Sequence, residues 1–109
     1  MVLDLDGRLE IGDGDIEFVA CVDRLIQTGQ RKLIVNLRSV VHIDRGGLGA
    51  LLAKHVSLRT RGGDLKLLHL TESTHRALAV TRVLRVVETF HSESDAIASF
   101  EDREPHGTV

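Results

Sequence analysis

The sequence predicts a single α/β domain in which a mostly parallel sheet of four to five strands is flanked by four helices. Short apolar segments bounded by glycine or polar residues alternate with segments whose apolar residues recur at helical spacing. This alternation favours right-handed crossovers and parallel strands. At 109 residues, 42% of them apolar, the chain is long enough for one hydrophobic core and too short for two.

Four segments are predicted to form the strands. The first, residues 1–9, alternates less regularly than the others. The three that read as buried strands are residues 32–37 (KLIVNL), 64–70 (DLKLLHL) and 84–90 (LRVVETF). Within this sheet we expect Val35, Leu37, Leu67 and Val87 to lie in the core.

Four helices are predicted between and after these strands. The first begins near Asp13 and stops at Gly29, and the second begins near Asp44, with Leu51 and Leu52 facing inward, and ends before the glycine pair at 62–63. The third, residues 73–83, has Thr71 as its cap. The last opens on a variant capping box at 92–95 and runs to about residue 100. The domain therefore spans 1–102, and 103–109 is predicted to be a disordered tail.

Composition excludes several classes of protein. The net charge is −2 without a basic block, and the chain has no Trp or Tyr, so a nucleic-acid partner is not expected. No segment approaches the ~20 apolar residues of a membrane span, so we expect a soluble, cytoplasmic protein without membrane insertion. The one cysteine, Cys21, is predicted to be a buried, inert thiol.

Catalytic and metal-binding patterns are also missing from the sequence. Six histidines are present, yet none forms an H-x₃-H or H-E-x-x-H pattern, and the single cysteine has no partner at ligand spacing. We expect His55 and His69 to be structural. The glycine-rich segment lacks both the Lys-Ser/Thr ending of a phosphate-binding loop and the G-x-G-x-x-G spacing. We therefore predict no enzyme, no metal and no cofactor.

The most informative segment follows the second predicted strand, where Asp44 stands before a helix start that holds Gly46, Gly47 and Gly49. Asp44 can accept backbone N–H groups of the first turn, and its charge complements the helix dipole. Each glycine inside a helix costs about 1 kcal/mol relative to alanine. Three of them in four positions indicate either unusual dihedral angles or a bare surface that another molecule approaches closely.

This segment resembles the signature loop of STAS domains, the family of bacterial anti-sigma-factor antagonists. The stretch Ile43–Gly49 (IDRGGLG) matches at the apolar residue, the aspartate and the final Gly-Leu-Gly. Further similar pieces follow in the expected order, at 7–12 (GRLEIG), 33–37 (LIVNL) and 61–68 (RGGDLKLL), so that the resemblance covers about residues 2–102.

The resemblance implies a regulator that binds an anti-sigma factor or a related serine-kinase-like protein, with a homodimer also possible. The residues that it implies for partner binding are Asp44, Arg45, Gly46, Gly47, Leu48, Gly49 and, on the exposed face of the following helix, Lys54 and Arg59. As a position of little consequence for binding, we take Lys66. A STAS-type accessory subunit of an ABC transport assembly is the alternative, but those proteins tend to keep a hydroxyl residue in the loop.

Two departures from the family pattern carry expectations of their own. The serine that is phosphorylated in typical antagonists corresponds to Gly46, and the serine before it corresponds to Arg45. Without a hydroxyl the loop cannot be phosphorylated, so we expect binding that this switch does not control. Family members also have a further strand before the first one here, so we expect an exposed sheet edge.

Overall fold

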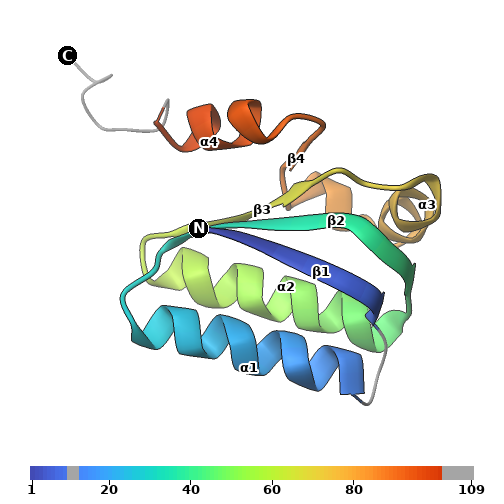
Figure 1. Ribbon diagram of the computed structural model, residues 1–109, viewed down its shortest axis with the longest axis horizontal. Helices are drawn as coiled ribbons and strands as arrows, with labels where there is room; N and C mark the ends of the chain where they lie inside the picture. The colour runs from blue at the N-terminus through green and yellow to red at the C-terminus, as the bar shows by residue number, and fades with distance from the viewer. Residues whose placement is uncertain (10–12, 102–109) are drawn as a thin grey trace.

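The computed structural model describes residues 1–9 and 13–101 (Figure 1). Its elements are β1 (Val2–Leu9), α1 (Asp13–Gln27), β2 (Lys32–Ile43), α2 (Arg45–Thr60), β3 (Asp64–Leu68), α3 (Glu72–Val80), the 3₁₀ helix η1 (Val83–Arg85), β4 (Thr89–Phe90) and α4 (Glu93–Glu101). The predicted tail at 103–109 lies outside the described residues.

The strands form one parallel sheet in the order β1-β2-β3-β4, so each strand pairs with its neighbour in the sequence. The predicted α/β class, the parallel sheet and the four helices are confirmed. β1 lies at one edge of the sheet and the two-residue β4 at the other.

Helices cover both faces of the sheet. α1 and α2 lie side by side against one face, and α4 lies across the other (Figure 1). Because side chains alternate along a strand, Leu33 and Val35 of β2 join the core under α1 and α2, while Ile34 joins a smaller cluster with Phe100 of α4. The predicted core is confirmed at Val35, Leu37, Leu51, Leu67 and Val87, all of which are buried.

β2 is twice as long as predicted. It was expected to end at residue 37, but it continues to Ile43, with Ser39 opposite Asp6 and Ile43 opposite Leu9 of β1. β3 ends opposite Asn36, so the second half of β2 has a strand neighbour on the β1 side only. The sequence did not indicate a strand over residues 38–43, because exposed residues surround the two buried side chains there, Val40 and Ile43.

The fourth predicted strand is mostly wrong. Residues 83–85 form a 3₁₀ helix, which follows Arg82 in a left-handed conformation, and the strand is confined to Thr89–Phe90. Val83 and Val87 are both buried, and the Val87 N–H donates to the Val83 carbonyl at 3.0 Å. The apolar residues therefore follow a helical spacing here and not the alternation of a strand.

Smaller differences also have local causes. β3 stops at Leu68, two residues early, because His69 takes a left-handed φ of 56°. Cys21, expected to be buried, is only half-buried. Lys66, chosen as a position of little consequence for binding, is unsuitable as a control because its side chain is completely buried between β3 and α4.

Candidate functional site

Asp44 is the single residue between the end of β2 and the start of α2. Its backbone is extended, and its carboxylate Oδ1 accepts a hydrogen bond of 2.9 Å from the backbone N–H of Gly47. The negative charge thus lies at the positive end of the α2 dipole. The predicted N-cap is confirmed, and it fixes the direction in which α2 leaves the sheet.

The glycines of this segment lie inside the first two turns of α2. Gly46 is half-buried, Gly47 is buried and Gly49 is exposed. Among the glycines that the structure describes, positive φ angles occur at positions 7, 29 and 62, so unusual dihedrals do not explain the ones in α2. A Cβ placed on Gly49 would meet no heavy atom within 4 Å. Packing does not require glycine at 49, and the residue leaves a bare patch on the helix.

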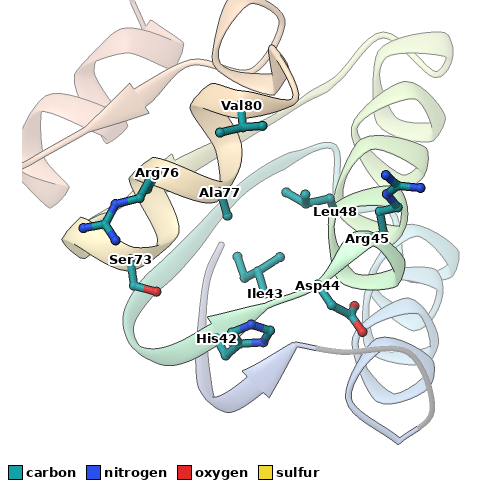
Figure 2. Close-up of a pocket in the computed structure, with 9 residues that line it drawn as sticks. All are labelled: His42, Ile43, Asp44, Arg45, Leu48, Ser73, Arg76, Ala77 and Val80. Carbon is teal, nitrogen blue, oxygen red and sulfur yellow. The ribbon is translucent and has the colours of Figure 1, made fainter.

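A hollow of about 380 Å³ lies beside this helix start, between α2 and α3 (Figure 2). Its apolar side chains include Ile43 from the end of β2, Leu48 from α2 and Ala77 from α3. Arg45 stands on the α2 side and Arg76 on the α3 side, and their guanidinium groups are directed away from the centre of the hollow. The full lining is His42, Ile43, Asp44, Arg45, Leu48, Ser73, Arg76, Ala77 and Val80. Of the predicted residues, Asp44, Arg45 and Leu48 line this hollow, whereas Gly46, Gly47 and Gly49 do not, and α3 supplies the other side.

Sequence reasoning missed the α3 half of this surface. Its lining residues, Ser73, Arg76, Ala77 and Val80, follow the i, i+3, i+4, i+7 spacing of one helical face. That spacing was visible in the sequence, but it is shared with any helix that packs on a core. The sequence alone could not show that Val80 on this face is exposed to solvent.

Lys54 does not join the other predicted partner-binding residues. Its ammonium group lies 2.7 Å from Asp23 Oδ1 of α1, and only 14% of its side chain is exposed. The pair connects α2 with α1, on the side of α2 away from α3 (Figure 1). We therefore leave Lys54 out of the candidate site.

A buried polar group lies further along α2. His55 is buried, and its Nε2 lies 3.3 Å from Oδ1 of the buried Asp64, whose Oδ2 lies 3.3 Å from Arg59. Burial lowers the pKa of His55 below its ordinary value, and the charge of Arg59 acts in the same direction, while Asp64 opposes them. Nδ1 of His55 is buried and has no hydrogen-bond partner among the described residues. The structural role predicted for His55 fits this position.

Residues 1–9 and 13–101 contain neither a cluster of metal ligands nor a membrane-spanning helix. No group of three or more His, Cys, Asp or Glu side chains there is placed to hold a metal ion. In the same part of the chain, no helix combines the length and apolar character needed to cross a membrane.

Comparison with known proteins identifies the family. The model of the STAS domain matches residues 2–96, which is most of the chain. The chain belongs to the STAS domain family. The matched residues include Ile43–Gly49, the segment that carried the resemblance in the sequence.

Relatives of this STAS domain match over more than four fifths of their own length. The anti-sigma F factor antagonist of Paenibacillus polymyxa is 22% identical over 93% of this chain and 86% of its own. A candidate anti-sigma factor antagonist of Thermotoga maritima is 27% identical, with a TM-score of 0.81 over 90% of this chain and 86% of its own. A sulfate transporter family protein of Wolinella succinogenes shares the fold, with 18% identity and a TM-score of 0.72 over 90% and 81%.

Proposed function

We propose that this STAS domain is a non-catalytic regulator of the anti-sigma-factor-antagonist type, which binds an anti-sigma factor of the serine-kinase class. The relatives named as such antagonists support the proposal, since they match over nearly their full length. The docking surface that we propose comprises Asp44–Gly49 and the adjoining hollow between α2 and α3.

The observation that carries the proposal is the bare patch at Gly49. A glycine in an exposed helical position weakens the helix by about 1 kcal/mol relative to alanine. Here neither backbone conformation nor neighbouring atoms demand it, because φ is not positive and the space beside Cα is open. A patch kept bare at such a cost fits a surface on which another molecule rests.

Gly46 determines whether phosphorylation can control the proposed complex. It stands in the first turn of α2, next to Arg45, which lines the hollow. A phosphoserine there would bring about −1.5 to −2 charges and three acceptor oxygens. Glycine brings neither, so we propose that the partner binds constitutively and that no phosphate at this position ends the complex.

The test is calorimetric titration of the purified protein with each serine-kinase anti-sigma factor encoded in the same genome. Gly46→Asp places a carboxylate in the first turn of α2, where the helix dipole favours it, so the fold is expected to tolerate the change. We expect one of these anti-sigma factors to bind the unaltered protein and Gly46→Asp to weaken that binding at least tenfold.

The matched control is Ala98→Asp, which adds the same charge to an exposed position of α4, on the other face of the sheet. It is expected to leave the affinity unchanged, and thermal melting verifies that both variants fold. Equal affinities for the unaltered protein and Gly46→Asp would show that the loop is only a turn.

The likeness to the Wolinella succinogenes protein is one of fold alone, and no contact of the described residues favours a transport role.

A further inference from the structure

A second hollow lies along α2, beyond the one at Asp44. It has a volume of about 370 Å³ and is lined by His55, Val56, Arg59, Thr60 and Val86. Both hollows are thus walled by α2 on one side and, on the other, by the segment that runs from α3 into η1 and Val86. We call the two hollows together, with the residues that line them, the α2–α3 groove.

Apolar side chains border this groove and are exposed to solvent. Val80 is 79% exposed, Val86 56% and Val56 51%. A single exposed valine is ordinary on a protein surface, but three beside neighbouring hollows form a concentration that marks interaction sites. The first borders the hollow at Asp44, and the other two border the second hollow.

The groove is also positively charged. Arg45 and Arg76 line the first hollow and Arg59 lines the second, while α2 contains no acidic residue from Arg45 to Thr60. The segment between Val80 and Val86 also contains Arg82 and Arg85, which are exposed but line neither hollow. Since the whole chain has a net charge of −2, this concentration of arginine is local.

The nearby acidic groups compensate part of this charge. Asp44 caps α2, and Asp64 is buried beneath Arg59. Glu72 lies 3.2 Å from Arg76, in an ion pair that is open to solvent on both sides and therefore weak. The linings of the two hollows hold three arginines, Arg45, Arg59 and Arg76, against one acidic residue, Asp44, so their excess charge is positive.

We propose that the α2–α3 groove binds an acidic amphipathic helix of the partner. Leu48 in the first hollow and His55 in the second are seven residues apart on α2, or about 10.5 Å along its axis. A docked helix places its own residues i and i+7 at the same spacing on one face. Apolar residues at those positions fit the two hollows, and acidic residues beside them face Arg45, Arg76 and Arg59.

This inference rests on the proposed function, because it names the chemistry of the partner segment at the same surface. The first test uses two helical peptides of about 16 residues with leucine at i, i+3, i+4 and i+7. One has glutamate on the remaining face and the other has lysine. Fluorescence anisotropy should show that the acidic peptide binds and that added salt weakens it, while the lysine peptide does not bind.

The second test changes the groove itself. Val80→Asp and Arg76→Glu are expected to weaken binding of the acidic peptide at least tenfold. Their controls are Ile16→Asp and Arg24→Glu, which make the same changes at exposed positions of α1. Equal binding of the two peptides, or groove variants that bind as the unaltered protein does, would overturn the inference.

The two proposals fail in different ways. If an anti-sigma factor binds and Gly46→Asp weakens it, but Val80→Asp and Arg76→Glu do not, the groove inference is wrong and the proposed function stands. If no anti-sigma factor binds while the acidic peptide does so through Val80 and Arg76, the groove inference stands and the proposed function is wrong.

Discussion

The ammonium group of Lys66 in β3 donates a hydrogen bond of 2.6 Å to the hydroxyl of Ser99 in α4. The same group lies 4.3 Å from the ring centre of Phe100, 5.6 Å from that of Phe90 and 3.5 Å from a carboxylate oxygen of Glu88. A buried charge is tolerated where a hydroxyl, an acid and aromatic faces replace its water. Lys66 therefore fastens α4 to the sheet.

Lys66→Ala should destabilise the fold strongly. It removes a completely buried side chain and leaves a cavity beneath α4, for which we expect a loss of about 2 to 4 kcal/mol in the free energy of unfolding. Lys66→Met should cost less, since it keeps most of the volume and removes the need to bury a charge. Urea unfolding followed by circular dichroism measures both, and an unchanged midpoint for Lys66→Ala would contradict this role.

The buried His55 should make stability depend on pH. Its pKa is lowered from 6.5 in the folded chain, mainly by burial, so on acidification the unfolded chain takes up a proton before the folded chain does. The contribution of neutral His55 to the free energy of unfolding is therefore complete above pH 6.5, and it is lost as the pH falls below that value.

The measurement is the free energy of unfolding of the unaltered protein and of His55→Gln at about pH 7.5 and 5.5. The advantage of the unaltered protein over the variant should shrink at the lower pH. His75→Gln, at an exposed position, is the control and should not alter the pH dependence. An advantage that grows on acidification would mean that the attraction of Asp64 outweighs burial.

Two glycines should respond oppositely to alanine. A Cβ on Gly63 would overlap the carbonyl oxygen of Arg31, which also accepts the Asp64 N–H at 2.9 Å. Gly63→Ala should therefore cost about 2 kcal/mol or more. Gly49→Ala meets open space in a helix and should stabilise by about 1 kcal/mol. Thermal melting distinguishes them, and equal shifts in one direction would refute the packing described for either site.

The segment Asp44–Gly49 should gain a phosphorylation site by two changes. It contains no hydroxyl, so a serine-kinase anti-sigma factor that binds the protein should leave it unmodified in the presence of ATP. Arg45→Ser with Gly46→Ser should supply an acceptor in the first turn of α2, where the helix dipole also stabilises the phosphate. Mass spectrometry locates the phosphate. Modification of Ser39 or Ser57 in the unaltered protein would show that regulation acts elsewhere.

Much of the fold could be predicted because local signals agreed with packing. Asp44 and Thr71 were recognised as helix caps, and both make the expected hydrogen bonds. Strands with continuous apolar runs, such as the one around Val35, are buried on both faces and are hard to mistake. The stretch at 83–87 was misread because a short apolar run has the same composition in a strand and in a 3₁₀ turn.

The candidate site was predictable only on its α2 side. A cap followed by glycines has a local signature, whereas the approach of α3 to α2 is a tertiary relationship. The position of Lys54 is likewise a tertiary relationship, since nothing in the sequence places it beside Asp23 of α1. Lys66 is a further case, because a lysine in a strand ordinarily faces solvent and its burial depends on α4 folding over it.

The unequal lengths of β2 and β3 have a consequence for local stability. Beyond Asn36, β2 has a strand partner on one side only, so its last residues before Asp44 can separate from the sheet without disturbing the central strands. We therefore expect the amides of residues 40–43 to exchange hydrogen through openings of lower free energy than those of Leu33 and Val35. The surface at the start of α2 thus adjoins the end of the sheet that opens more easily. A partner bound there should slow the hydrogen exchange of the amides of residues 40–43.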